Sequence, residues 1–486
     1  MARVVVLGAG IAGHTAALLL RKELADELHQ VTVVSPRRQY NWVPSNIWVG
    51  VGKMNPSDVV FDLPPVYARE GIAFHLAKAV AIHPEGDAQD STPFVAVEST
   101  DPARPGERAR IPYDYLVNAT GPRLNFAATE GLGPQANSTS VCTPDHAVEA
   151  ARRLDEVVAR MERGERQTIV IGMGHGTCTC QGAAFEYAFN VDFVLRERGV
   201  RHLARLVFLS NEAELGDFGV GGAHLRRGGY RVHTKHFAES LYAERGIEWI
   251  LGAHVQRVEP GVLHYETLDG EEHTLAFDMS MLIPPFAGQP IKAFDRAGAD
   301  ITAEMFAPSG FMKVDADYTA KPFDAWKASD WPRTYQSPRH ANVFAVGIAF
   351  APPHPISRPQ KSRRGTNITP SPPRTGMPSA VMARTVAFSI RDMILFGAAH
   401  PTHTASMAEI GASCVASAGA SWLHGTAASM TMFPIVPDFE KYPETGRDLR
   451  FTFGEIGAAG HWIKTILHHM FLWKARARPG WSFIPE

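Results

Sequence analysis

The sequence predicts an α/β protein with two Rossmann-like dinucleotide-binding folds and, near its C-terminal end, an amphipathic helix for membrane contact. A glycine-rich turn directly follows an apolar run at residues 4–7, and a second follows the apolar run at residues 167–171. Apolar side chains then recur at helical spacing around residue 470. A chain of 486 residues that is 45% hydrophobic has enough apolar surface for two or three cores.

Composition and charge limit the partners. A formal net charge of -2 argues against nucleic acid as the main partner. Four cysteines are too few for a disulfide scaffold, and the sequence predicts no metal site. The first strand enters its glycine turn at once, so we expect no signal peptide and synthesis in the cytoplasm. All apolar runs fall short of the ~18–20 residues that span a membrane. Attachment to a membrane surface and a homo-oligomer both stay open.

The first dinucleotide-binding unit opens the chain. Its strand at residues 4–7 leads into a tight turn with glycines spaced for a pyrophosphate, namely Gly8, Gly10 and Gly13. A helix to about Glu27 and a strand at residues 30–34 complete the β-α-β unit. Because Ser35 and not an acidic residue ends that strand, we assign no carboxylate to the ribose contact and expect Ser35 beside the cofactor.

The second unit has the same pattern with a different turn. Strands at residues 167–171 and 206–209 flank a Gly-x-Gly-x-Gly turn and a helix at residues 183–198. Ser210 follows the second strand, so no carboxylate is expected for a nicotinamide ribose. The turn runs into Cys180 instead. We interpret this unit as one in which thiol chemistry takes the place of a nicotinamide site.

Two further strands end in turns that are typical of flavoproteins. One closes on Thr120 and Gly121, and a late one closes on Gly347. The predicted division is then an FAD-binding domain, a second Rossmann-like domain and a C-terminal segment, at residues 1–125 with 290–380, 126–289 and 381–486.

The C-terminal segment contains an apolar stripe at helical spacing: Trp462, Ile463, Ile466, Leu467, Met470, Phe471 and Trp473. Such a stripe often faces a core. Here the terminal tryptophans and a basic tail that includes Arg476 and Arg478 favour a helix that lies in one leaflet of a membrane.

Several segments together resemble the sulfide:quinone oxidoreductase family. They cover nearly the whole chain in order and lie at residues 43–52, 140–147, 180–187, 373–376 and 413–416. The resemblance implies FAD as cofactor, with Cys180 and Cys414 beside the flavin, bridged directly or through sulfur. It implies that Cys142 is an outer cysteine that accepts or releases sulfur. Cys178 matches no family site.

The turns and the resemblance together give the remaining candidate residues. Cofactor contacts are expected, beyond the glycines and Ser35, from Asn46, Thr120, Gly121, Gly347, Arg374 and Thr375. Quinone contacts are expected from Gly376, Leu467 and Phe471. Glu186 and His146 are candidate proton carriers. A glutamate on a helix is more often a salt-bridge or capping partner, and a local structural hydrogen bond accounts equally well for His146.

The chemistry of sulfide fits these cysteines. Hydrosulfide is a small soft nucleophile that opens a disulfide by exchange, and the leaving thiolate needs a positive or dipolar setting. Cys180 lies directly before a predicted helix, whose N-terminus supplies such a dipole. The freed thiolate then passes its electron pair to the flavin, and a quinone re-oxidises it.

Departures from the family pattern and three alternatives stay open. Val415, Ser417, Arg374 and Asp217 stand where many members have other residues, which puts the quinone pocket and proton path in doubt more than the thiols. The alternatives are a sulfide dehydrogenase flavoprotein that passes electrons to a cytochrome, an NADH:quinone oxidoreductase, and a non-catalytic sulfur carrier or redox sensor.

Overall fold

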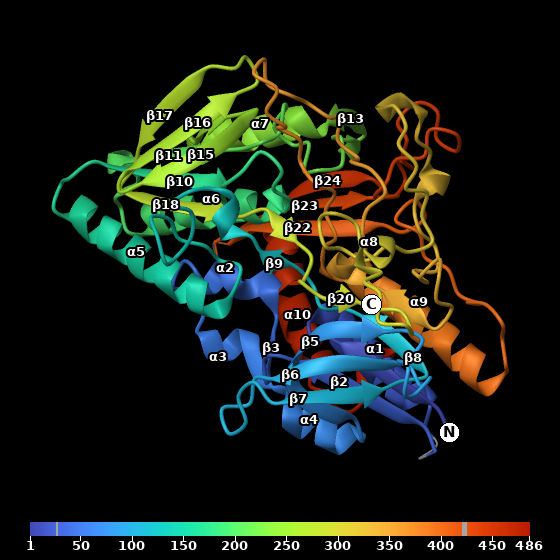
Figure 1. Ribbon diagram of the computed structural model, residues 1–486. Coiled ribbons are helices and arrows are strands. Elements are labelled where there is room, and N and C mark those ends of the chain that lie inside the picture. Colours follow the sequence, from blue (N-terminus) through green and yellow to red (C-terminus); the bar gives the residue numbers. More distant parts are fainter. Residues whose placement is uncertain (26–27, 420–424) are drawn as a thin grey trace.

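The computed structural model describes residues 1–25, 28–419 and 425–486. Two sheets, each with a core of parallel strands, contain the strands that lead into the two glycine-rich turns. A third sheet contains, from the C-terminal part of the chain, the strands β22 (Ala412–Ala418), β23 (Thr426–Met432) and β24 (Phe453–Gly457) (Figure 1). The predicted fold class is confirmed. The division into three domains stays a prediction.

The first unit forms as expected around β1 (Arg3–Leu7), which pairs in parallel with β2 (Gln30–Ser35) and β8 (Tyr115–Asn118). Helix α1 (Ile11–Glu23) connects β1 to β2 and ends at Glu23, whereas the predicted end at Glu27 lies outside the described residues. The other strands along this sheet are β21 (Val343–Ala345), β5 (Ala73–His83), β6 (Phe94–Ser99) and β7 (Arg108–Pro112).

Between β2 and β5 the chain makes short elements that border the same unit. They are β3 (Gln39–Asn41), α2 (Asn46–Val49), α3 (Pro56–Val59), β4 (Val60–Asp62) and α4 (Leu63–Glu70). Much later, α9 (Gly376–Leu395) packs along α1. Gly347 allows this packing, because it has a φ of +64° and a Cβ there would lie 3.0 Å from the Cβ of Ala12. The segment between β21 and α9 contains no α-helix or strand.

The second unit is a four-stranded parallel sheet in the order β14-β11-β10-β18. Its strands are β10 (Gln167–Met173), β11 (Ala204–Leu209), β14 (Glu248–Ile250) and β18 (Met279–Ile283). Helices α5 (Pro144–Glu162), α6 (Gln181–Glu197) and α7 (Thr234–Arg245) accompany it. A small antiparallel sheet adds β15 (Ala253–Glu259), β16 (Val262–Thr267) and β17 (Glu272–Ala276).

A five-stranded sheet in the order β13-β12-β24-β23-β22 was not predicted. Its strands are β12 (His224–Arg227), β13 (Tyr230–His233), β22 (Ala412–Ala418), β23 (Thr426–Met432) and β24 (Phe453–Gly457). The sheet therefore joins residues that the sequence assigned to the second domain and to the C-terminal segment. β22 packs against α6, and this contact positions the site.

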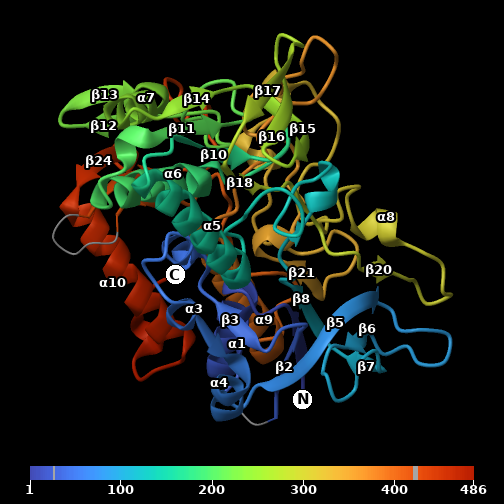
Figure 2. The same ribbon diagram turned by 90° about the vertical axis from the view of Figure 1, so that its left-hand side faces the viewer.

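Helix α10 (Ala458–Ala475) follows β24 directly. Figure 2 shows it along one side of the molecule, from the five-stranded sheet toward α3 and α4. Among the described residues, no helix combines the length and the apolar character needed to cross a membrane.

Candidate active site

Cys180 is the residue that starts α6, immediately after the second glycine-rich turn. It adopts a left-handed conformation with a φ of 73°, which is uncommon for a residue other than glycine and is often found at functional positions. Among the described residues, no side chain caps this end of the helix. Cys180 therefore lies at the positive end of the α6 dipole, beside N–H groups that have no partner within the helix.

Cys414 reaches the same helix end from β22. Its Sγ lies 3.4 Å from the position that a Cβ on Gly182 would take, so the glycine in the first turn of α6 leaves the room that this sulfur uses. The structure thus brings together two cysteines that are more than two hundred residues apart. Both are free thiols here.

The surroundings disfavour a charged thiol at both positions. Burial raises the pKa of Cys180 to about 12, and the neighbouring Cys142 adds to the shift, while Arg374 acts in the opposite direction. Burial likewise raises the pKa of Cys414 to about 11; Glu186 adds to this shift, and Lys464 opposes it. Sulfur in this site is therefore more stable in an uncharged form, and a thiolate depends on the helix end and the nearby cations.

The other two cysteines differ in their contacts. The backbone N–H of Cys142 donates to the Ser140 hydroxyl. Cys142 also lies close enough to Cys180 to raise the pKa of its thiol electrostatically. Cys178 is fully buried, and its thiol donates to the Ile283 carbonyl at 3.1 Å. Its contacts are those of a packing residue, which agrees with the absence of a matching family site.

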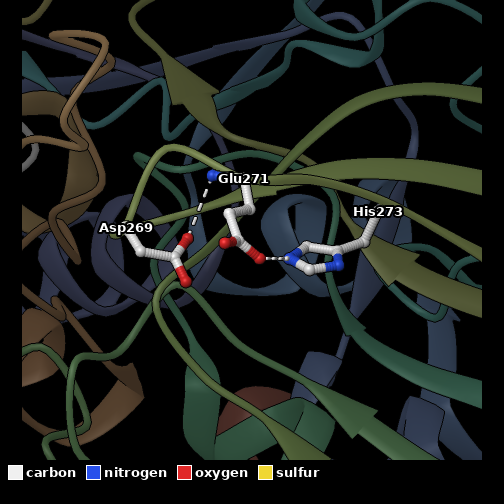
Figure 3. Close-up of side chains that lie close together, drawn as sticks. All are labelled: Asp269, Glu271 and His273. Carbon is white, nitrogen blue, oxygen red and sulfur yellow. Dashed lines mark hydrogen bonds and ion pairs between the residues drawn. The ribbon is translucent and has the colours of Figure 1, made fainter.

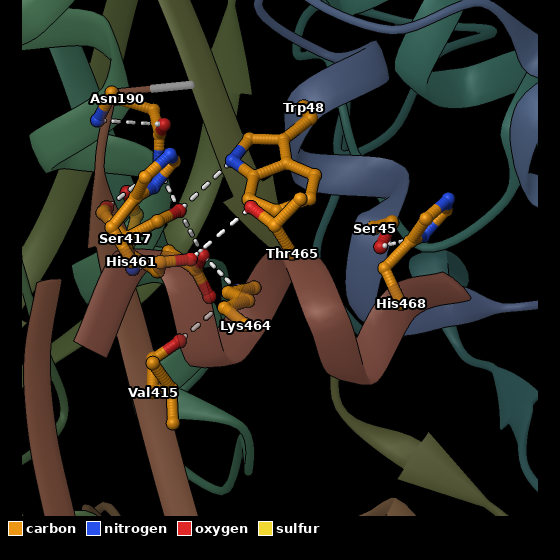
Figure 4. Close-up of polar contacts among 11 residues, drawn as sticks. Ser45, Trp48, Asn190, Val415, Ser417, His461, Lys464, Thr465 and His468 are labelled. Atoms are coloured by element: carbon orange, nitrogen blue, oxygen red, sulfur yellow. Dashed lines mark hydrogen bonds and ion pairs between the residues drawn. The ribbon is translucent and has the colours of Figure 1, made fainter. Parts of the chain in front are cut away.

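Glu186 lies one and a half turns into α6, in a buried polar cluster behind Cys414. Its carboxylate accepts from the Ser417 backbone N–H at 3.1 Å and forms an ion pair with Lys464 of α10. Trp48 and Asn190 complete the cluster through the Ser417 hydroxyl (Figure 4). Lys464 is not among the residues predicted from the sequence, because no local pattern indicates that it is buried against Glu186.

His146 lies in the first turn of α5, where its backbone N–H donates to the Thr143 hydroxyl that caps the helix. Its ring contacts Phe126, and burial lowers its pKa. The ring nitrogen Nδ1 is buried and has no hydrogen-bond partner in the described part of the chain, and the role of His146 as proton carrier stays a prediction.

The first glycine turn has the shape that a pyrophosphate requires. A Cβ on Gly8 would lie 2.3 Å from the Ala119 carbonyl oxygen, and one on Gly13 would lie 2.0 Å from the Gly8 carbonyl oxygen. In contrast, a Cβ on Gly10 would meet no atom within 4 Å. Gly10 starts α1 and no side chain caps it, so open space and free N–H groups coincide at one helix N-terminus. This cradle fits the diphosphate of FAD.

The other predicted cofactor residues are partly or fully buried, and their cofactor contacts stay predictions. Ser35 is buried at the end of β2 and bonds the backbone of Arg37. Asn46 is fully buried, and its amide donates to the Val141 carbonyl. Thr120 bonds the Asn118 side chain before Gly121, which has a φ of +67°.

Arg374 and Thr375 lie at the end of the segment that leads from β21 to α9. Thr375 directly precedes Gly376, the first residue of the helix. The Arg374 guanidinium is buried, donates to the Ile348 carbonyl at 3.1 Å and lies 4.5 Å from the centre of the Phe311 ring. Burial lowers its pKa to about 10. Arg374 thus supplies positive charge near Cys180.

The second glycine turn is filled by protein groups. The amide of Asn211 donates to the Gly176 and Cys178 carbonyls. The sequence analysis found no carboxylate at Ser210, yet Glu212 follows two residues later and is fully buried. Burial, together with Asp217, raises the pKa of Glu212 to about 7. Its carboxylate accepts from the Ser210 hydroxyl and the backbone of Phe218, so it is engaged within its own loop.

A mostly apolar pocket lies between α1, α9 and α10. Two of the three predicted quinone residues, Gly376 and Phe471, line it, whereas Leu467 does not. Lys474 and Glu486 also line it and form an ion pair at 2.7 Å. No local sequence pattern indicates this pair, because it depends on how the residues after α10 fold back.

A group of potential metal ligands lies elsewhere and is exposed. Asp269, Glu271 and His273 come together at the tip between β16 and β17 (Figure 3). The Asp269 carboxylate already accepts from the Glu271 backbone, and His273 stacks on Tyr265. We assign no metal site to this group.

The chain is similar to known flavoproteins over its whole length. The family model for pyridine nucleotide-disulphide oxidoreductases matches residues 2–284. A sulfide-quinone reductase of Aquifex aeolicus (strain VF5) is 31% identical over 473 residues, which cover 97% of this chain and 91% of that protein.

Solved structures agree. The X-ray structure of the sulfide:quinone oxidoreductase from the hyperthermophilic bacterium Aquifex aeolicus matches with a TM-score of 0.75 at 29% identity, over 98% of this chain and 92% of the other. NDH2 from Plasmodium falciparum shares the fold, with a TM-score of 0.62 at 10% identity over 98% and 96% of the two chains. The chain therefore belongs to the pyridine nucleotide-disulphide oxidoreductase family and, within it, to the sulfide-quinone reductases.

Proposed function

We propose that this protein is a sulfide:quinone oxidoreductase that oxidises sulfide at Cys180 and Cys414 and passes the electrons through FAD to a quinone at a membrane surface. The observation that carries the proposal is the meeting of these two cysteines at the uncapped N-terminus of α6. Family membership supports the flavin and the two substrates; the cysteine geometry supports the route between them.

The sulfide step is an exchange at a bridge between the two cysteines. Hydrosulfide attacks the Cys180 sulfur, so that a new S–S bond forms there, the bond to Cys414 breaks, and Cys414 leaves as a thiolate. The negative charge of hydrosulfide is thereby transferred to Cys414, next to the first turn of α6. FAD, when bound, accepts the electron pair and stores it until a quinone arrives.

Burial of the two sulfurs favours an uncharged resting state of the bridge in this scheme. Because both sulfurs lie where burial raises the thiol pKa, an uncharged bridge is favoured over two thiolates. A second hydrosulfide attacks the outer sulfur of the Cys180 persulfide, so that a new S–S bond forms in the released disulfide species and Cys180 is freed as a thiolate. The thiolates of Cys180 and Cys414 would re-form the bridge as their two electrons pass to FAD. Cys142, which is near enough to influence Cys180, is the proposed alternative acceptor of the outer sulfur, in place of the second hydrosulfide.

The pocket between α1, α9 and α10 is the proposed quinone site. Phe471 and Met377 supply apolar surface, and Gly376 links the pocket to the end of α9 beside the cofactor cradle. Quinone reduction consumes two electrons and two protons. The Lys474–Glu486 pair adds charge to this lining, and the Lys474 ammonium also donates to the Ile484 and Pro485 carbonyls, so it holds the tail against α10.

Helix α10 supports membrane contact because its polarity is reversed relative to an ordinary surface helix. Lys464, His468 and Lys474 are buried, whereas Ile463 and Ile466 are 50% and 57% exposed. The other large apolar side chains exposed along α10 and the tail are Trp462, Trp473 and Phe483. A solvent-exposed apolar face beside the proposed quinone pocket fits insertion of α10 into one leaflet of a membrane.

The cysteine assignment gives a test with an internal control. Cys180→Ser and Cys414→Ser each remove one half of the bridge, so we expect the rate of flavin bleaching by sulfide, followed anaerobically, to fall at least about a thousandfold. Cys178→Ser, two residues from Cys180, changes only a packing contact and is expected to bleach normally. Equal losses in all three variants, or bleaching by NADH instead of sulfide, would contradict the assignment.

The pocket assignment separates the two half-reactions. Phe471→Ala removes an apolar wall of the pocket, so we expect re-oxidation of the reduced flavin by a short-chain quinone to slow about tenfold. Bleaching by sulfide serves as the control and is expected to stay unchanged. If the sulfide step slows and the quinone step does not, the pocket is not the quinone site.

The exposed face of α10 is tested by vesicle binding. A variant with Ile463→Ser, Ile466→Ser and Trp473→Ser loses the apolar surface that enters the leaflet, so its partition onto liposomes is expected to fall about a hundredfold or more. Co-sedimentation measures it, with thermal melting as the check on folding. Unchanged sedimentation of the folded variant would rule out this face as the contact.

A further inference from the structure

A buried ion pair connects α10 to α6, beside the strand that carries Cys414. Lys464 is 8% exposed and Glu186 is 6% exposed, and the two form a salt bridge between α10 and α6. The Lys464 ammonium also donates to the Val415 carbonyl at 3.1 Å, one residue from Cys414. Removing charged groups from water is costly, so a pair retained here needs a reason beyond stability.

The Glu186–Lys464 pair contacts the backbone of β22 on the C-terminal side of Cys414. The Glu186 carboxylate holds the backbone and the hydroxyl of Ser417, three residues along β22, while Lys464 holds Val415 (Figure 4). The two opposite charges, on α6 and α10, therefore both contact the strand segment that carries the sulfur. Glu186 alone would oppose a negative sulfur, and the cation offsets it.

We propose that Lys464 is a positioning residue of the sulfide half-reaction: its ammonium offsets the Glu186 carboxylate behind Cys414, so that Cys414 can leave as a thiolate when sulfide opens the bridge. The inference rests on the proposed function and adds to it a residue on the membrane-contacting helix. In the exchange, the electron pair of the broken S–S bond stays on Cys414, and the ammonium stabilises that charge without itself losing a proton.

The other titratable groups around this corner do not replace Lys464. His461 lies one turn away on α10, and burial, together with the Lys464 charge, lowers its pKa, which keeps its ring uncharged at neutral pH. His468 bonds the Ser45 hydroxyl toward α2, and burial lowers its pKa to about 4. At the start of α6 the neighbouring group is Cys180, whose own pKa is raised by burial.

The test uses the opposite signs of the two partners. In the reduced flavin-loaded protein, the rate of Cys414 alkylation by iodoacetamide, followed by peptide mass spectrometry across neutral and alkaline pH, reports its thiolate fraction. We expect Lys464→Met to lower this rate about tenfold or more at a given pH, which corresponds to one pKa unit. Glu186→Gln is expected to raise the rate. The double variant has no unpaired buried charge, and its rate should return close to that of the natural protein.

The matched control is Lys53→Met, which breaks an exposed ion pair with Glu197 at the other end of α6 and should leave the alkylation rate unchanged. A purely structural role of Lys464 would move both single variants in the same direction. That result, or no change in Lys464→Met, would overturn the inference. If the natural protein is not bleached by sulfide, the proposed function fails instead, and the alkylation rates still decide the role of Lys464.

Discussion

The packing of β22 against the first turn of α6 is the contact on which the rest of the site depends. It requires a small residue at Gly182, where the Cys414 sulfur approaches, and a left-handed residue at Cys180, which turns the chain from the glycine loop into the helix. The parallel strand β10 delivers the helix N-terminus to this point, as it does in any Rossmann-like unit. Here that helix end meets two sulfurs, and the turn in which a dinucleotide would lie is filled by Asn211.

Helix α10 unites the two halves of the proposed reaction. Toward its start, Lys464 reaches the strand of Cys414, and toward its end, Phe471 and Lys474 line the pocket beside α9. The polar side chains of α10, such as Lys464 and Lys474, are buried at the two proposed sites. Large apolar side chains on the opposite face of the helix are exposed. This reversal explains why the sequence shows an apolar stripe at helical spacing that does not belong to the core.

Local patterns in the sequence were sufficient for the two dinucleotide-binding units. The glycines near Gly10 and the strand that precedes Cys180 are contiguous signals whose physical meaning does not depend on distant contacts. The cysteines were singled out for the same reason, since each lies in its own short motif. The resemblance to a family then supplied their pairing, which no local pattern contains.

What the sequence did not reveal depends on contacts between distant segments. Two strands of the five-stranded sheet, β22 and β23, are rich in small residues such as alanine and serine and lack the clear alternation of apolar and polar side chains that marks a half-buried strand. Lys464 looks like a solvated basic residue until the partner Glu186, far away along the chain, is known to lie opposite. The Lys474–Glu486 pair likewise arises only when the tail folds back.

The central claim is that Cys180 and Cys414 form the sulfur bridge at the end of α6. Mass-spectrometric mapping of the oxidised protein, digested without reduction, tests it most directly. We expect the peptide that contains Cys180 to be joined to the peptide that contains Cys414, with the mass of a disulfide or of that bond plus whole sulfur atoms. A bridge from Cys180 to Cys142 or Cys178, or an unmodified Cys414, would contradict the account.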